Sequence, residues 1–166
     1  IGRAVQEILR MYAIKDFQCE PHHQHQNFAE RRIQEVKKLS NALLDRSGSP
    51  PSLWLLCVQH VVYILNRLST ESLQWTTPIE AATGQQPDIS AIMAFQWYEP
   101  VYYKYYTSNN KPPKYPSESR ERFGRIVGIA AHQGDALTFL VLNAETNHVV
   151  TRSELRSDLT STSPNL

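Results

Sequence analysis

The sequence predicts an α/β region followed by a small antiparallel β-barrel, and two observations carry this prediction. In the first half of the chain, apolar residues recur at the spacing of one helix face over residues 4–12 and 28–46, and they fill most of residues 52–68. From residue 95 the pattern changes to short β-branched and aromatic runs separated by turn residues. The chain has 166 residues, of which 41% are hydrophobic, so it can bury a core.

The first elements are a helix, a short strand and a polar loop. Residues 4–12 predict the helix, and the loose alternation over 14–19 predicts the strand. The polar stretch that follows has no periodicity, and we expect Asn27 at its end to cap the helix over 28–46. This cap places Glu30 in the first helical turn.

The two longest helices are expected to form a hairpin. The helix over 28–46 has one apolar stripe with charged residues on its other faces, and Ser47-Gly48-Ser49-Pro50-Pro51 ends it. The helix over 52–68 is apolar nearly all round, so we expect it to pack between other elements. Its expected core residues are Trp54, Tyr63 and Leu65.

A connecting region leads to the predicted strands. A short helix over 78–82 is expected to end at Gly84. The predicted strands are 101–106, 125–131, 137–142 and one that ends near Arg152, with an irregular excursion over 107–119. The expected organisation is a first region over 1–68, a connection over 69–94, a β module over 95–156 and a disordered tail over 157–166.

Composition excludes several classes of protein. The 17 basic and 16 acidic side chains leave a formal charge of +1, so any affinity for nucleic acid must come from local patches. The longest apolar run, 53–65, is broken by Gln59 and His60, which predicts no membrane partner. Two cysteines without a CxxC partner favour a reduced, intracellular protein. The chain begins at Ile1 without a signal-peptide pattern, so we expect a piece of a longer protein.

Short blocks of sequence follow one another in a definite order. The first is HQNFAERRI over 25–33, in which Glu30 follows a Gln-Asn pair. Trp54, YILNR over 63–67 and TPIE over 77–80 come next, the last followed by Gly84, Pro87 and Asp88. This succession resembles the third acidic motif, and the blocks after it, of integrases from copia-type LTR retrotransposons. Residues 124–130, 137–142 and 149–153 are similar to an SH3-like β module downstream in the same polyproteins.

The resemblance implies a fold and an activity for residues 1–156. Residues 1–68 would be the last part of an RNase H-like integrase core, and 95–156 the SH3-like module. The parent protein would join element DNA ends to target DNA in the nucleus, using Mg²⁺ or Mn²⁺ held by three carboxylates. Its expected partners are DNA, the upstream part of the polyprotein and a second copy of the chain.

The family has three catalytic carboxylates, which bind the metal ions. Glu30 is the one residue of this chain that matches any of the three. Both aspartates of the family are expected upstream of Ile1, and Asp16 matches no motif position. We therefore expect no joining activity and no tightly bound metal in this chain alone. The bulky Phe28 also departs from the Gly or Pro that the family usually has after the Gln-Asn pair.

Basic residues suggest where nucleic acid would bind. Arg31 and Lys38 could contact phosphates or could simply lie on the wet face of their helix, and the sequence leaves both open. Residues 100–125 hold six basic and two acidic side chains, with tyrosines among them. This interleaving suits nucleic acid, although tyrosines also pack ordinary barrels. The basic candidates are Lys104, Lys111, Lys114, Arg120, Arg122 and Arg125. His22, His23 and His25 are expected to be solvated loop residues, without zinc.

Two other functions stay open. One is a non-catalytic nucleic-acid-binding module descended from such an element. The other is an inert structural remnant. The presence of Glu30 argues against the first, whereas the absence of both aspartates is consistent with the second.

Overall fold

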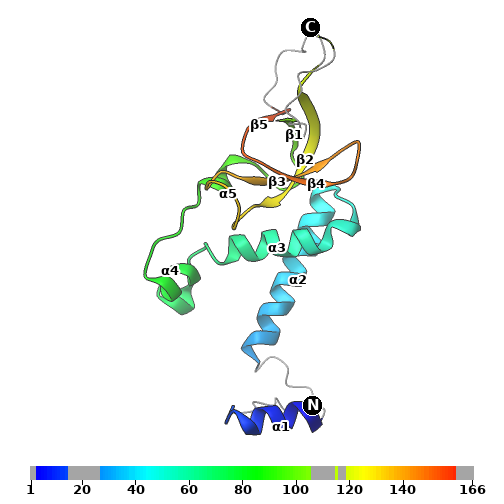
Figure 1. The fold of residues 1–166 in the computed structure, drawn as a ribbon. Helices are drawn as coiled ribbons and strands as arrows, with labels where there is room; N and C mark the ends of the chain where they lie inside the picture. The colour runs from blue at the N-terminus through cyan, green and yellow to red at the C-terminus, as the bar shows by residue number, and fades with distance from the viewer. Residues whose placement is uncertain (1–2, 15–26, 106–114, 116–118, 160–166) are drawn as a thin grey trace. The chain divides into compact units, whose positions relative to one another are not determined.

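The computed structural model describes residues 3–14, 27–105, 115 and 119–159. The chain divides into two compact units, Ile1–Glu35 and Val36–Leu166, which are described separately. Helix α2 runs across the boundary between them (Figure 1). Within the described ranges, no helix combines the length and the apolar character that crossing a bilayer requires.

The first unit contains α1 (Arg3–Met11) and the first turns of α2 (Phe28–Ser47). Both helices confirm the sequence prediction. Asn27 caps α2 as expected, since its Oδ1 accepts hydrogen bonds from the backbone N–H groups of Ala29 at 3.0 Å and Glu30 at 3.3 Å. The strand predicted over 14–19 lies outside the described residues, apart from Ile14, which is not in a strand.

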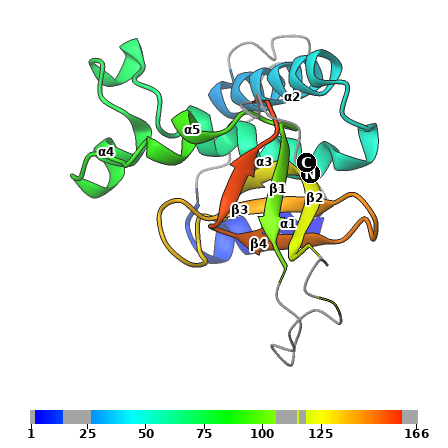
Figure 2. The same ribbon diagram turned by 90° about the horizontal axis from the view of Figure 1, so that it is seen from above.

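The helices of the second unit begin with the last turns of α2. Five short or medium elements follow: η2 (Pro51–Leu53), α3 (Trp54–Leu65), η3 (Glu71–Leu73), α4 (Pro78–Thr83) and α5 (Ser90–Ala94). Local signals place α4, because Thr77 Oγ1 accepts from the Glu80 N–H at 3.1 Å and Gly84 ends the helix at φ 71°. Helix α4 lies away from the sheet, at the far end of the connecting segment (Figure 2).

Helix α3 corrects one prediction. It ends at Leu65, and it is not packed on all sides. Cys57, His60 and Val61 are buried, but Trp54 is 44% and Leu55 61% exposed. The reason is that α3 has neighbours on only part of its surface, namely α2 and β2, so the rest of its apolar surface faces outward. Trp54 is therefore not a core residue, whereas Tyr63 and Leu65 are half-buried.

Five antiparallel strands form one sheet in the order β4-β3-β2-β1-β5. Their bounds are β1 (Pro100–Lys104), β2 (Glu121–Ile129), β3 (Phe139–Asn143), β4 (Val149–Arg152) and β5 (Leu155–Ser157). The predicted mixture of helices and an antiparallel sheet is confirmed. The residues after Arg156 are not all irregular, because Ser157 belongs to β5 and pairs with Val101.

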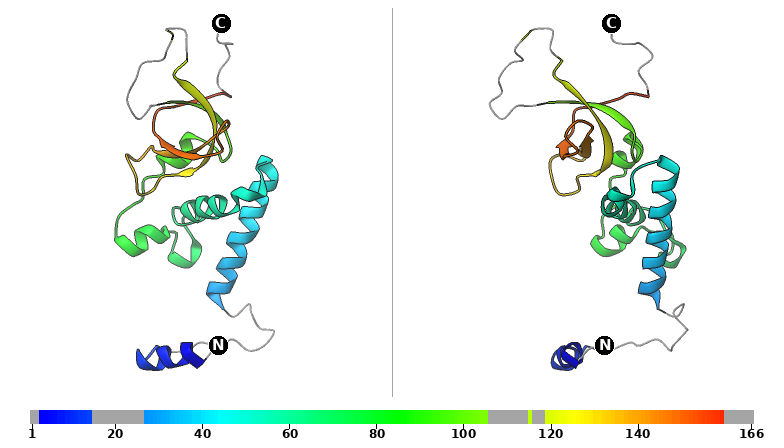
Figure 3. Two further views of the ribbon diagram at one scale, coloured as in Figure 1. Left: turned by 45° about the vertical axis from the view of Figure 1, so that its right-hand side comes forward. Right: turned by 90° about the vertical axis from the view of Figure 1, so that its right-hand side faces the viewer.

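The predicted closure into a barrel is wrong, because the sheet stays open. The edge strands β4 and β5 have four and three residues, and no ladder joins them. The sheet curls so that its edges approach (Figure 3). A side chain links β4 to β1, the neighbour of the edge strand β5: Arg152 Nε, at the end of β4, donates to the Lys104 carbonyl at 3.1 Å.

Two apolar clusters form the core of the second unit. The first fills the curled sheet and contains Ala91, Val101, Tyr103, Ile126, Phe139 and Val141. The second joins the helices to the sheet and contains Leu53, Cys57, Val61, Trp97 and Val127. Trp97 also donates from Nε1 to Ser49 Oγ at 3.1 Å. From Val36 onward, the second cluster therefore packs the end of α2 and helix α3 against the sheet. The domain limits expected from the sequence stay predictions.

Candidate functional site

Glu30 stands at the beginning of α2. It is half-buried in the first turn, and Asn27 fixes the start of its helix. Its carboxylate forms no salt bridge with another described residue. The next side chain, Arg31, is exposed, and Lys38 is exposed two turns later. The exposure of Arg31 and Lys38 is compatible with a contact to phosphate. It is equally compatible with a position on the solvated face of the helix.

The described ranges hold no cluster of three His, Cys, Asp or Glu side chains that could bind a metal ion. Asp16, His22, His23 and His25 lie outside those ranges. A pair of Mg²⁺ ions in a joining reaction needs several carboxylates, and within the described part of the chain Glu30 belongs to no group of three potential metal ligands. The described residues therefore do not fit a two-metal centre.

The described basic residues that the sequence singled out in this region lie in strands β1 and β2 or just before β2. Lys104 ends β1, Arg122 and Arg125 lie in β2, and Arg120 is exposed just before β2. Lys111 and Lys114 lie outside the described residues. The structure thus brings four of the six candidates of this region onto two paired strands and their approach.

Most of these cations are matched by local acceptors. Arg122 pairs with Glu145 at 2.7 Å, and Lys104 pairs with Glu154 at 3.2 Å. Arg125 donates to the Tyr98 carbonyl at 3.3 Å. Exposed pairs of this kind contribute little to stability and are screened by salt, so a phosphate can compete for the cation. Acidic partners nevertheless reduce the positive potential of this surface.

The tyrosines of this region divide between the core and the surface. Tyr103 is 1% exposed and belongs to the core, whereas Tyr105 is 44% exposed. Arginines stack on several of them: the Arg122 guanidinium carbon lies 5.3 Å from the Tyr105 ring centre, and that of Arg125 lies 4.6 Å from the Tyr98 ring centre. These contacts place the guanidinium groups over tyrosine rings, where a cation is attracted to the face of the ring.

Sequence reasoning missed two arginines of the same sheet. Arg156 lies 4.8 Å from the Tyr102 ring centre and pairs with Glu121 at 2.7 Å, and Arg152 lies 5.8 Å from the Tyr103 ring centre. In the sequence, Arg152 follows the β-branched run 149–151, and Arg156 follows Leu155. An arginine next to such residues near the end of the predicted module is the signal that would have placed both on strands.

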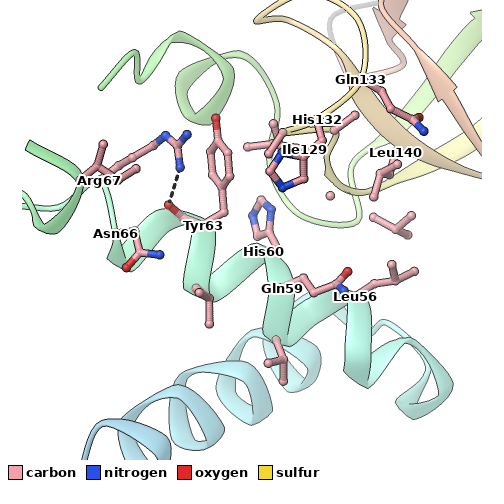
Figure 4. Close-up of a pocket in the computed structure, with 17 residues that line it drawn as sticks. Leu56, Gln59, His60, Tyr63, Asn66, Arg67, Ile129, His132, Gln133 and Leu140 are labelled. Atoms are coloured by element: carbon pink, nitrogen blue, oxygen red, sulfur yellow. Dashed lines mark hydrogen bonds between the residues drawn. The ribbon is translucent and has the colours of Figure 1, made fainter. Parts of the chain in front are cut away.

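A pocket of about 710 Å³ lies between α3 and the sheet (Figure 4). Helix α3 lines it with Leu56, Gln59, His60 and Tyr63, while β2 and the loop after it contribute Ile129, His132 and Gln133. None of the candidate residues named from the sequence is among the side chains that line it. His60 is 6% exposed, and burial lowers its pKa to about 4. The signal that could have indicated it was a histidine within an apolar helix.

Comparisons with known proteins indicate where such a sequence occurs. No family model matches the chain. A retrovirus-related Pol polyprotein from transposon RE2 of Arabidopsis thaliana is 27% identical over 92 residues, which cover 55% of this chain and 6% of that protein. The Pol polyprotein from transposon RE1 of the same plant is 26% identical over 93 residues, with the same coverage. The chain is thus similar over half its length to a small part of two retrotransposon Pol polyproteins, which supports a transposon-derived segment.

Proposed function

We propose that this chain is a segment of a copia-type integrase, whose parent protein joins element DNA ends to target DNA. The observation that carries the proposal is the ordered succession of motif blocks around Glu30, together with the similarity to Pol polyproteins from transposons. The Asn27 cap supports it further, since it fixes Glu30 in the first turn of a long helix. In the parent, this carboxylate would be one of three that bind the metal ions.

The finer fold assignment belongs to the same proposal. Helices α2 and α3 would be the closing hairpin of an RNase H-like core, and the five-stranded sheet would be the SH3-like module. The strand order supports the second assignment, because β1 lies between β2 and the last strand, β5, while β2, β3 and β4 follow one another as a meander. The Trp97 contact with Ser49 then makes the hairpin and the module parts of one packed unit.

We further propose that the segment alone binds DNA weakly and catalyses nothing. One carboxylate leaves the metal ions without their other ligands, so joining requires the upstream part of the polyprotein. The proposed DNA contacts are Arg31, Lys38 and the basic surface of β1 and β2. Arg120 is exposed just before β2 and forms no ion pair with another described residue, so it is well placed to meet a phosphate.

One alternative is an inert remnant. The ion pairs at Lys104 and Arg122 favour it, since a surface whose cations are already matched has little field left to attract DNA. The integrase proposal also includes a nuclear location for the parent protein and self-association of the chain.

The test measures binding of random-sequence duplex DNA to the whole chain as a function of salt concentration. Replacing Lys111, Lys114, Arg120 and Arg122 by Ala should weaken binding to all sequences equally and reduce the slope of log K against log salt by about 1 for each lost phosphate contact. Glu145→Gln is the matched variant with the opposite effect, since it frees Arg122 and should strengthen binding. An unchanged slope in the quadruple variant would exclude this surface and favour the inert remnant.

A further inference from the structure

The pocket between α3 and the sheet extends along the helix. Its lining residues on α3 and its C-cap run from Leu56 to Asn66, which corresponds to roughly 15 Å along the helix axis. Arg67 follows directly after the cap. Figure 4 shows Arg67 at one end of this row, and Leu56 and Leu140 at the other. The two ends of the pocket therefore differ in chemistry, because one carries a cation and the other is apolar.

The Arg67 guanidinium is held in place and keeps donors for a ligand. Its Nη1 donates to the Tyr63 carbonyl at 3.2 Å, and its central carbon lies 3.5 Å from the Tyr63 ring centre. Its Nε is buried and out of reach of a ligand. Its Nη2 donates to no described group and is not one of the buried atoms without a partner, so solvent reaches it. Arg67 thus presents a fixed positive charge with free N–H groups.

No acidic residue is among the described lining residues of this pocket, so Arg67 sets the sign of its charge. Asp88 and Asp135 line a smaller pocket that shares Arg67 and Tyr63 with it. Hydrogen bonds with Ser90 are the main reason why the pKa of Asp88 lies below its ordinary value, and the Arg67 charge adds to this shift. Arg67 forms no ion pair with a described acidic residue. Asp88 therefore weakens the positive field without occupying the guanidinium.

Apolar side chains line most of the remaining pocket. They belong to Leu56, Val62, Ile79, Ile129 and Leu140. The volume of about 710 Å³ is in the range of sites for small ligands. A phosphate group is usually held by several cations or backbone N–H groups, whereas this pocket offers one guanidinium group and apolar walls. This combination fits a ligand with one carboxylate and an apolar body.

We propose that this pocket binds an apolar molecule that ends in a carboxylate, with the carboxylate at Arg67 Nη2 and the apolar body along α3 toward Leu56. A carboxylate accepts charge-assisted hydrogen bonds from a guanidinium, and burial of the apolar body adds affinity in proportion to its area. Such a ligand is either a free amphiphilic acid or the C-terminal residues of a polypeptide, which share this chemistry. The proposal does not depend on the integrase assignment, because the pocket contains neither Glu30 nor any residue named as a DNA contact.

Four probes test the proposal by titration of the whole chain at pH 7, followed by NMR shifts of amides and arginine side chains. Octanoate combines the two features, octanol lacks the charge, octylammonium reverses it, and acetate lacks the apolar body. We expect octanoate to bind about 3- to 10-fold more tightly than octanol, and octylammonium and acetate to bind more weakly than octanoate. The shifts should centre on the Arg67 side chain, Ile129 and Ala130. Equal affinity for octanoate and octanol, preferred binding of octylammonium, equal binding of acetate, or no saturable binding would each overturn the proposal.

Three variants show whether Arg67 is responsible. Arg67→Gln should remove the preference for octanoate over octanol, whereas Arg46→Gln, at an exposed arginine outside the pocket, should leave it intact. Asp88→Asn should raise the affinity for octanoate about 2-fold, because it removes a competing negative charge and its Oδ1 can still accept from the Ser90 N–H. This increase serves if Arg67→Gln does not fold. A preference that survives Arg67→Gln, or an unchanged affinity in Asp88→Asn, would refute the assigned contact.

A short peptide distinguishes the two sources of the ligand. N-acetyl-dileucine ends in a free carboxylate after two apolar side chains, and its C-terminal amide lacks the charge. Binding of the free acid as tight as that of octanoate indicates a polypeptide C-terminus, and weaker binding indicates a free amphiphilic acid. The acid should bind more tightly than its amide in either case. Equal binding of acid and amide would contradict the role of the carboxylate.

Discussion

His60 should make the stability of the second unit depend on pH. Its folded pKa is about 4, against 6.5 for an unperturbed histidine, because the buried site disfavours the charged ring. The unfolded chain therefore binds this proton more readily than the folded one. The stability that depends on a neutral His60 is fully present above pH 6.5 and is lost as the pH falls toward 4.

The magnitude follows from the two pKa values. Between pH 7 and pH 5, His60 alone should lower the free energy of unfolding by about 2 kcal/mol, with about 3 kcal/mol as the limit below pH 4. The interval from pH 7 to 5 is the useful one, because most carboxylates stay ionised there.

Urea unfolding at pH 7, 6 and 5 measures this effect. The wild-type chain should lose about 2 kcal/mol more over this interval than His60→Leu, which has no ring to protonate. His148→Leu removes an exposed histidine and should keep the wild-type dependence. The reasoning is refuted if His60→Leu shows the same pH dependence as the wild type.

Three further substitutions test the packing described above. Gly124→Ala should destabilise the sheet by about 1–3 kcal/mol in urea unfolding, since its Cβ would lie 2.7 Å from the Leu142 carbonyl oxygen; equal stability would show that the strands adjust freely. Ser49→Ala should cost about 1–3 kcal/mol by leaving the buried Trp97 N–H without an acceptor, and an unchanged unfolding midpoint would contradict this. Asn27→Ala should destabilise the start of α2 by about 1 kcal/mol and increase amide exchange there, and unchanged exchange would show that the cap is dispensable.

Local chemistry made parts of the fold predictable. The Asn27 cap and the Thr77–Gly84 limits of α4 depend on residues within one or two helical turns, so the sequence contains the whole signal. Turn residues and β-branched runs likewise indicated the strands. Closure of the sheet depends on whether β4 and β5 pair, and no local pattern determines that.

Distant contacts explain the remaining differences. Trp54 is apolar and stands in an apolar helix, but its exposure depends on which neighbours reach that side of α3. The basic surface shows the same limit. Arg122 pairs with Glu145, 23 positions later, and Lys104 pairs with Glu154. Both acidic partners lie outside 100–125, so the net charge counted over that segment is larger than the positive potential at the folded surface. The pocket at His60 combines α3 with a loop some 70 positions away, and only the folded structure unites them.

The most direct measurement for the central claim is a joining assay with labelled element-end DNA and Mg²⁺. It compares this chain with the same chain extended by the sequence upstream of Ile1 in its reading frame. We predict no product from the chain alone, product from the extended protein, and none from the extended protein with Glu30→Gln. Glu35→Gln, which alters an exposed carboxylate on the same helix, should retain activity. Joining by the chain alone, or by the extended protein with Gln at position 30, would contradict the assignment of Glu30.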